Sequence, residues 1–339
     1  MQFSHKALVT GANGHLGNNL VRFLLSKGIP VRASVRNPAS CKEAFEGLDC
    51  EVVKADITDK ASMVKALEGI EVFYAVGAVF KLWARNPQKE IYENNLEGVR
   101  ITMEAAAEAG VKRVVYISSI AALDYTKHPI REDGGYNPDR RDPYYNSKND
   151  AEKLAIQLAK ERGLDLVIVM PSAMIGGEAH GKLNTSYNII RLILKGEVPV
   201  ETGIAVNWID VKDVAKASWL AAEKGRSGER YIIANEKAMS IRDTTRLAME
   251  LFPKRKISLP VAVPRFLLFT FASILETVSQ ITKSAPLLST KDLAMFAGLR
   301  QDFDISKART ELGFEPTPPE TAVKEAMQYW VANEKRLGK

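Results

Sequence analysis

The sequence predicts an α/β fold in which parallel strands form a sheet covered by helices on both faces. Short apolar runs alternate with amphipathic stretches through the first half of the 339 residues. A glycine-rich turn joins the first apolar run to the first amphipathic stretch. The 46% hydrophobic and 26% charged residues are ordinary for a globular protein, and the length suits one large domain or two closely joined ones.

Apolar runs and amphipathic stretches alternate through most of the chain up to Pro171. Short apolar runs between turn residues predict strands, and an apolar period near that of the α-helix predicts helices. The expected strands are 6–11, 30–36, 50–57, 71–79, 111–119 and 164–172, and the expected helices are 15–28, 59–70, 88–110 and 144–163.

Beyond Pro171 the alternation becomes irregular, which predicts a second, smaller lobe. We expect residues 1–172 to form the main domain, with a segment at about 203–235 returning to it. Residues 173–202 and 236–325 are expected to form the smaller lobe. The chain is therefore expected to pass between the two parts more than once, so that no single residue separates them.

The charge is modest, with 47 basic and 41 acidic residues and a formal net charge of +6. No block of basic residues suggests a nucleic-acid-binding arm, and the charge favours at most an anionic small ligand. Cys41 and Cys50 lack the spacing of a metal site or a disulfide framework, so we expect free thiols in a reducing compartment. With no signal-peptide pattern, a cytoplasmic location is expected.

Residues 261–275 form the most apolar segment, VAVPRFLLFTFASIL. The segment is too short to span a bilayer, and Pro264 and Arg265 interrupt it. We expect a buried helix or a lid over the substrate, with contact to a membrane surface as the alternative.

Gly11, Gly14 and Gly17 lie between the first predicted strand and the first predicted helix. In that context a glycine turn allows a tight bend, close approach of a pyrophosphate and close packing of helix on sheet. The helix N-terminus adds amide donors and positive potential. The sequence therefore predicts a Rossmann-type, doubly wound sheet that binds a dinucleotide.

The end of the second strand selects between the two nicotinamide dinucleotides, since an acidic residue there suits NAD and an arginine suits the 2′-phosphate of NADP. Strand 30–36 carries Arg32 and Arg36 and no acid. Arg36 stands at the strand end, and Lys42 adds charge nearby. NADP(H) is therefore the expected cofactor, with Asp56 and Ile57 placed to meet its adenine.

Tyr144 and Lys148 lie four residues apart at the start of a predicted helix, so they share one face. A nearby ammonium stabilises a phenolate, which lets a tyrosine exchange a proton with a carbonyl or an alcohol. Ser118 and Ser119 end the fifth strand, at the sheet edge where ligands bind in such folds. Either hydroxyl would polarise a substrate oxygen.

The chain resembles an extended short-chain dehydrogenase/reductase, in the epimerase/dehydratase superfamily. The segments that carry the resemblance are TGANGHLG (10–17), ADI, YENNLEG, the strand-end serines, YYNSK, PSAMIG (171–176) and WIDVKDVA (208–215). The segment VRASVRNP is most similar to the dihydroflavonol-4-reductase-like branch, while AVFKLWARNPQKEIYENNLEGV resembles bacterial members described as hopanoid-associated sugar epimerases. The segment AVGAV and the second lobe depart from the family pattern, so no substrate carries over.

The resemblance implies a catalytic triad of Ser119, Tyr144 and Lys148, with Ser119 favoured over Ser118. It also implies that Asn95 braces the sheet and that the pair of long helices, 88–109 and 144–162, forms a homodimer. The expected cofactor-binding residues are Gly11, Asn13, Gly14, His15, Leu16, Gly17, Arg36, Lys42, Asp56, Ile57, Ala75, Val76, Gly77, Tyr144, Lys148, Pro171, Ala173, Met174 and Ser186.

The leading hypothesis is an NADPH-dependent reductase of a ketone or aldehyde, with a substrate pocket lined by Phe80, Trp83, Met174, Tyr187 and the segment 261–275. The alternative is an NAD-dependent nucleotide-sugar epimerase or dehydratase, in which Arg191 and Lys195 would meet the sugar nucleotide. A third hypothesis is an NADP-sensing protein without catalysis. No metal or nucleic acid is expected.

Overall fold

The computed structural model describes residues 6–77, 86–177, 184–282, 290, 293–294 and 298–337. A seven-stranded sheet in the order β11-β6-β5-β4-β1-β2-β3 forms its centre. Every neighbouring pair in this sheet runs parallel. The strands are β1 (Ala7–Thr10), β2 (Val31–Val35), β3 (Glu51–Lys54), β4 (Val72–Ala75), β5 (Arg113–Ile117), β6 (Asp165–Pro171) and β11 (Arg230–Ile233). The predicted α/β fold is confirmed.

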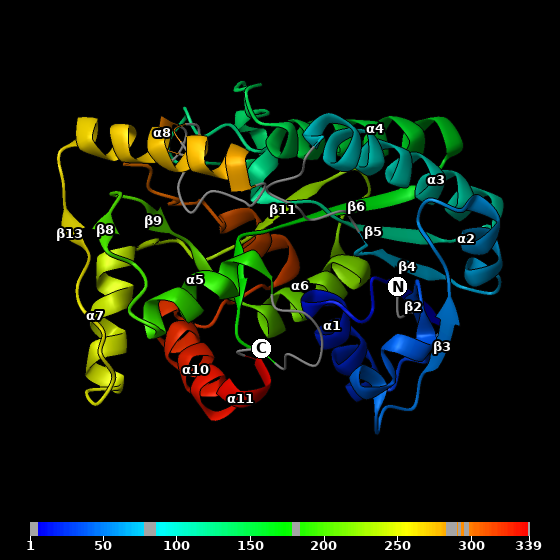
Figure 1. Ribbon diagram of the computed structural model, residues 1–339. Coiled ribbons are helices and arrows are strands. Elements are labelled where there is room, and N and C mark those ends of the chain that lie inside the picture. Colours follow the sequence, from blue (N-terminus) through cyan, green and yellow to red (C-terminus); the bar gives the residue numbers. More distant parts are fainter. Residues whose placement is uncertain are drawn as a thin grey trace.

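Helices cover both faces of this sheet (Figure 1). On one face, α3 packs against α2 and α4, and on the other α1 packs against α6. The helices are α1 (His15–Ser26), α2 (Lys60–Leu67), α3 (Asn94–Glu108), α4 (Pro143–Arg162) and α6 (Val211–Lys224). The sequence predicts one helix over 88–110, but the structure divides it into a π-helical turn, Gln88–Glu93, and α3.

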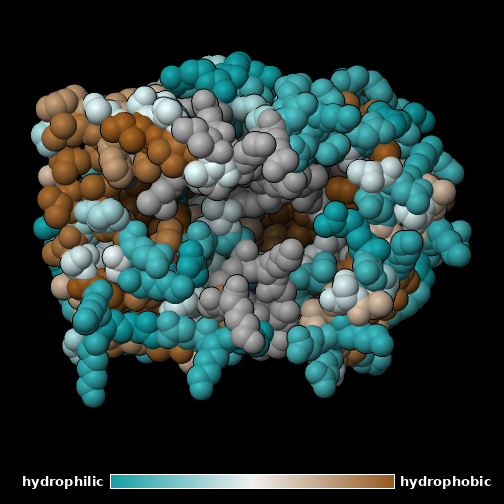
Figure 2. Space-filling view, viewed as in Figure 1, coloured by the Kyte–Doolittle hydropathy of each residue, from teal (hydrophilic) through white to brown (hydrophobic). Residues whose placement is uncertain are grey.

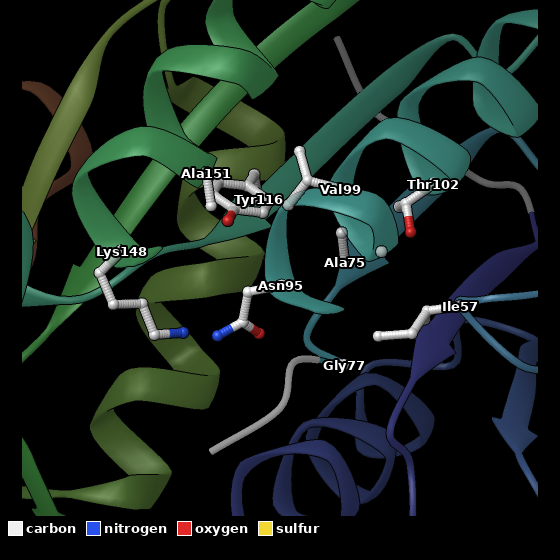
Figure 3. A pocket seen from close by; sticks show the side chains of 10 residues that line it. Ile57, Ala75, Gly77, Asn95, Val99, Thr102, Tyr116, Lys148 and Ala151 are labelled. Carbon is white, nitrogen blue, oxygen red and sulfur yellow. The ribbon is translucent and has the colours of Figure 1, made fainter. Parts of the chain in front are cut away.

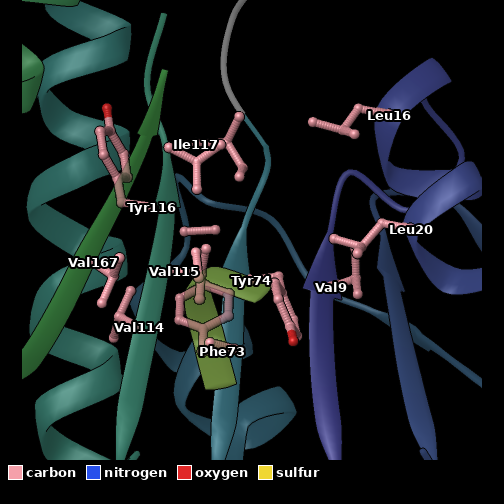
Figure 4. Packing of buried hydrophobic residues seen from close by; sticks show 14 of the residues in the cluster. Val9, Leu16, Leu20, Phe73, Tyr74, Val114, Val115, Tyr116, Ile117 and Val167 are labelled. Carbon is pink, nitrogen blue, oxygen red and sulfur yellow. The ribbon is translucent and has the colours of Figure 1, made fainter. Parts of the chain in front are cut away.

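The central strands carry apolar residues on both faces because both faces are covered. β4 is buried along its whole length, and β6 is buried from its second residue onward. Figure 4 shows Val114, Val115 and Val167 packing within this core, with Leu20 of α1 over Val9 of β1. The covered sheet gives the strand ends a fixed position, and the functional side chains follow those ends.

A second core holds the smaller lobe together. It contains α5 (Thr185–Leu194), α7 (Ile241–Leu251) and α10 (Pro319–Ala332), with Tyr187, Trp208 and Trp330 fully buried between them. Short strand pairs complete the lobe, namely β7 (Ala173–Ile175) with β10 (Trp208–Asp210), β8 (Val200–Glu201) with β13 (Val261–Ala262) and β9 (Ala205–Val206) with β12 (Met239–Ser240).

The chain crosses between the two cores more than once. β10 pairs in the smaller lobe, α6 then covers the main sheet, and β11 forms that sheet's edge. Phe303, Ile305 and Phe314 also pack in the main core, although the predicted lobe range 236–325 includes them. Because their side chains pack in the core of the main sheet, these residues cannot be assigned to one lobe from a sequence range alone.

The apolar segment near residue 270 is helical, but the expectation that it is buried is wrong. Residues 261–275 form β13 and the first part of helix α8 (Arg265–Thr282), on which Phe266 is 68% exposed and Ile274 is 55% exposed. Leu268 and Ala272 face inward in a small separate cluster with Leu293. In the described residues no helix is long and apolar enough to cross a membrane.

Candidate active site

The glycine turn forms an open cradle at the start of α1. Gly14 is the N-cap residue in extended conformation, no side chain caps the helix, and its first turn carries no acid. Gly11 has a φ of +60°, and a Cβ on Gly17 would lie 2.2 Å from the carbonyl oxygen of Gly11. Only glycine therefore fits at Gly17, and the amides at the helix start can bind an anion.

The end of β4 lies against this cradle. The Thr10 hydroxyl accepts hydrogen bonds from the amides of Val76 and Gly77, both at 3.0 Å. A Cβ on Gly11 would meet the Cα of Gly77 at 3.3 Å. The strand order reverses between β1 and β4, and ligands of such sheets bind beyond the strand ends at that point. Ala75, Val76 and Gly77 are thus placed beside the glycine turn.

Arg32 and Arg36 have different environments although they share β2 and its end. The Arg32 guanidinium pairs with Glu51 at 2.9 Å and donates to the Ala66 and Glu68 carbonyls at 2.6 and 2.9 Å. Arg36 is exposed, and no hydrogen bond or ion pair holds its side chain within the described residues. Arg32 therefore joins β2 to the end of α2, while the Arg36 side chain is exposed at the strand end.

Asp56 and Ile57 follow β3. One carboxylate oxygen of Asp56 accepts from the Thr58 amide at 3.0 Å and from the Thr58 hydroxyl at 2.8 Å. Ile57 lies against α3, where a Cβ on Gly98 would meet its Cδ1 at 3.1 Å. Ile57 also lines a pocket with Gly77, Asn95 and Lys148 (Figure 3).

Tyr144 and Lys148 come together because of how α4 begins. Pro143 occupies the first turn, and the N-cap carboxylate of Asp142 accepts from the amides of Tyr144 at 2.7 Å and Tyr145 at 3.2 Å. This capping fixes the first helical turn. One turn on, the Lys148 ammonium lies 5.7 Å from the centre of the Tyr144 ring.

Both side chains are buried, and burial shifts both pKa values. Burial lowers the pKa of Lys148 to about 8, and the Glu152 carboxylate partly opposes this by attracting the ammonium. Burial raises the pKa of Tyr144, and a hydrogen bond with the Ser119 hydroxyl works in the opposite direction. Perturbed groups of this kind gather at functional sites.

The two candidate serines have different partners. The Ser118 hydroxyl donates to the buried carboxylate of Glu152. The Ser119 hydroxyl accepts from the Ala121 amide at 3.1 Å and lies within hydrogen-bonding reach of Tyr144. The geometry therefore brings Ser119 to Tyr144 and directs Ser118 away from it.

A buried charge network behind the site was not anticipated from the sequence. The Glu152 carboxylate is fully buried and pairs with Arg230 of β11 at 2.7 Å. The Arg230 guanidinium lies 4.5 Å from the centre of the Tyr136 ring and donates to the carbonyl oxygen of Glu132 at 2.7 Å. Glu152 is one turn after Lys148, and this spacing was the one available signal.

The Asn95 side chain reaches α4. Its side-chain amide donates to the Ser147 hydroxyl at 3.0 Å, which in turn donates to the carbonyl oxygen of Tyr144 at 2.7 Å. In Figure 3 the Asn95 amide and the Lys148 ammonium point toward one another across the pocket. Asn95 therefore holds α3 against the turn that carries Tyr144.

His15 joins the glycine turn to the smaller lobe. Its Nε2 lies 2.7 Å from the carbonyl oxygen of Gly176, and its ring meets Tyr187 edge-on at 5.7 Å between centres. Burial lowers the His15 pKa. Tyr187 is fully buried and donates its hydroxyl proton to the Ala326 carbonyl at 2.8 Å, so it packs the second core and does not line a pocket as expected.

The remaining expected residues are spread along the cradle and the lobe boundary. Asn13 is exposed in the glycine turn, whereas Leu16 is 4% exposed and packs in the main core. The Met174 carbonyl accepts from the side-chain amide of Asn184 at 2.9 Å. Lys42 begins the short 3-10 helix Lys42–Phe45, and Pro171 ends β6. Ala173 begins β7, and Ser186 is the second residue of α5. Phe80 and Trp83 lie outside the described residues.

Residues 7–234 match the model of the NAD dependent epimerase/dehydratase family. The chain belongs to this family. It is thus an enzyme of the oxidoreductase type that acts on CH–OH or carbonyl groups. Two-thirds of the chain, including the entire central sheet and the Ser119–Tyr144–Lys148 arrangement, lie within the matched range.

Several proteins similar to this chain are named as reductases. A Synechocystis sp. protein provisionally named dihydroflavonol 4-reductase is 32% identical, with 96% of this chain and 94% of that protein covered. Cinnamoyl-CoA reductase 1 of Petunia hybrida is 32% identical over 74% of this chain and 78% of its own. The crystal structure of gox2253 aligns with a TM-score of 0.82 at 29% identity, covering 97% and 98% of the two chains.

Proposed function

We propose that this protein is an NADPH-dependent reductase of a ketone or aldehyde group in an apolar small molecule. The observation that carries the proposal is the joint placement of Ser119, Tyr144 and Lys148 beyond the strand ends, next to the glycine cradle. The similarity to proteins named as reductases supports reduction as the direction.

The cradle fits a dinucleotide. The uncapped start of α1 leaves amide donors for a pyrophosphate. The missing side chain at Gly17 lets the turn pack closely on the helix that carries those donors. Arg36 would hold the 2′-phosphate, with Lys42 adding charge, and Asp56 and Ile57 would meet the adenine. When bound, the reduced cofactor supplies the hydride that the carbonyl carbon receives.

In the proposed reaction the chain's own residues handle the oxygen and the proton. The Ser119 hydroxyl donates to the carbonyl oxygen and polarises it. The Tyr144 hydroxyl gives its proton to that oxygen as negative charge develops. The Lys148 ammonium, also placed to bind the nicotinamide ribose, stabilises the phenolate that Tyr144 leaves behind.

Burial strengthens each of these interactions. Lys148 and Tyr144 are 6% and 5% exposed, so little water screens the charge between them. A pKa of about 8 keeps Lys148 mostly charged at neutral pH. In the ligand-free protein the hydrogen bond with Ser119 lowers the pKa of Tyr144, against the larger effect of burial.

Purified protein tests the proposal with two assays. NADPH oxidation is followed with a panel of apolar ketones and aldehydes, and interconversion of nucleotide sugars is followed without added NADPH. We expect carbonyl-dependent NADPH oxidation and no interconversion of nucleotide sugars. Interconversion without net cofactor use would overturn the proposal in favour of an epimerase or dehydratase, and binding of NADPH with neither activity would favour a cofactor sensor.

A further inference from the structure

The exposed apolar side chains of this protein gather on one surface. The large hydrophobic residues exposed among the described residues are Val261, Phe266, Leu267, Phe271, Ile274 and Val278. All of them belong to β13 or α8. Figure 2 shows the resulting patch as brown atoms over α8, beside a mainly teal surface over α3 and α4. Contiguous patches of this kind mark interaction sites.

Helix α8 is apolar on both sides. Its inward side chains, Leu268 and Ala272, already pack beneath it and are 5% and 0% exposed. On the outer side Leu267, Phe271, Ile274 and Val278 follow one another at helical spacing and form a continuous stripe. Among the residues that the structure describes, packing against the protein therefore does not use this stripe.

Three exposed threonines of α8 are satisfied within the helix. Thr270, Thr277 and Thr282 each donate the hydroxyl proton to the carbonyl four residues earlier, at 3.0, 2.9 and 3.0 Å. Hydroxyls bonded in this way need no water partner and suit a helix in an apolar solvent. A face of apolar side chains and satisfied threonines fits hydrocarbon better than it fits water.

The charges near the stripe favour an anionic partner. The exposed Arg265 opens α8, and the net charge of the chain is +6. Glu276 is the single acid between 261 and 282, and its carboxylate accepts from the amide and hydroxyl of Thr290 at 2.8 and 3.0 Å. A second copy would bring the same positive charges together, whereas an anionic surface attracts them.

We propose that α8 and β13 dock this protein onto an anionic phospholipid membrane. The helix lies in the plane of the interface, with Phe266, Phe271 and Ile274 in the acyl region and Arg265 at the headgroups. This peripheral attachment is distinct from spanning, for which no described helix is long and apolar enough. An apolar substrate held in the membrane would then be close to the enzyme.

Vesicle sedimentation tests the proposal with the full chain. Vesicles of equal parts phosphatidylcholine and phosphatidylglycerol are compared with vesicles of phosphatidylcholine alone. We expect sedimentation with the anionic vesicles that weakens when salt is raised.

The double variant Phe271→Asp, Ile274→Asp should lower the partition coefficient by on the order of a hundredfold, since two side chains buried in the membrane are lost. A variant with the same change in charge, Gln157→Glu, Gln328→Glu, alters exposed residues of α4 and α10 and should bind nearly as the wild type does.

Two further measurements keep the test decisive. Phe271→Trp keeps an aromatic side chain in the stripe, and its emission should shift to the blue on addition of anionic vesicles. Light scattering without lipid reports self-association. Absence of vesicle binding, or equal binding by the Phe271→Asp, Ile274→Asp variant, would overturn the proposal. The patch would instead be a contact between two copies of the chain if the wild-type protein formed a dimer without binding vesicles and the same double variant dissociated that dimer.

Discussion

Arg36 and Arg32 show at the level of single residues why strand position alone does not assign a role. Both arginines come from the same strand and its end, and their sequence context is similar. Glu51 and two carbonyl oxygens hold Arg32, whereas Arg36 extends into solvent at the strand end. The partners of Arg32 come from residues distant in the sequence, and they make it a structural residue while Arg36 stays exposed. The sequence near the two arginines does not show these partners.

Arg36→Asp should weaken NADPH binding far more than NADH binding. Loss of a charge-assisted contact and the added repulsion from the 2′-phosphate should raise the Kd for NADPH by about tenfold to a hundredfold. Arg32→Gln is the matched control, because it should lower stability without changing the ratio of the two affinities. Titration of cofactor fluorescence measures both, and equal losses for the two cofactors in Arg36→Asp would remove the phosphate assignment.

Lys148 should give the reaction a pH limit. Since burial places its pKa at about 8, the ammonium is lost as the pH rises through that value, and kcat for carbonyl reduction should fall with it. Lysine in the unfolded chain has a pKa of 10.5. Between about pH 8 and pH 10.5 the unfolded chain therefore binds more protons than the folded chain, and the contribution of Lys148 to the free energy of unfolding rises with pH. Kinetic profiles and denaturation at several pH values measure both effects. A Lys148→Met variant that kept the same fall in kcat would contradict the assignment.

At the scale of elements, the glycine turn is a packing requirement as well as a ligand cradle. Gly17→Ala places a methyl group against the Gly11 carbonyl, which the turn cannot accommodate without moving. We expect loss of cofactor binding by more than tenfold, measured by calorimetry. Gly28→Ala is the control at the other end of α1, where φ is +72° but no atom lies within 4 Å. It should cost about 1–2 kcal/mol of stability and leave cofactor affinity unchanged. Equal cofactor affinity in both variants would show that the turn is not the binding site.

The Glu152–Arg230 pair connects α4 to the edge strand β11. Glu152→Gln leaves the Arg230 guanidinium buried without its counter-charge, so we expect a loss of about 3–5 kcal/mol in the free energy of unfolding. Arg230→Gln should lose a similar amount, and the double variant should lose less than the sum. Urea denaturation measures all three, and additive losses would mean that the two groups act independently.

Most strands and helices could be predicted because each depends on local pattern. Buried parallel strands are apolar runs, and glycine or an N-cap side chain marks the helix ends. The outer side of α8 was missed because an apolar side chain predicts burial whether the partner is the chain itself or something else. Tyr187 was misplaced for a related reason, since its contact with Ala326 joins residues 139 positions apart. The preference for Ser119 came from resemblance, and the hydrogen bond that separates it from Ser118 depends on the buried Glu152.

At the scale of the whole molecule, the two cores place one site at their boundary. The main sheet supplies the cradle and the serine, and α4 supplies the tyrosine and lysine. His15 connects the cradle to Gly176, at the start of the smaller lobe.

The central claim is proton donation by Tyr144 in NADPH-dependent carbonyl reduction, and a comparison of two neighbouring tyrosines tests it most directly. NADPH oxidation with an accepted ketone is measured for Tyr144→Phe and for Tyr145→Phe, alongside the Kd of NADPH for each. We predict that Tyr144→Phe lowers kcat by about a hundredfold to ten-thousandfold with nearly unchanged NADPH affinity, while Tyr145→Phe stays within about tenfold of the wild type. Full activity in Tyr144→Phe would contradict the account.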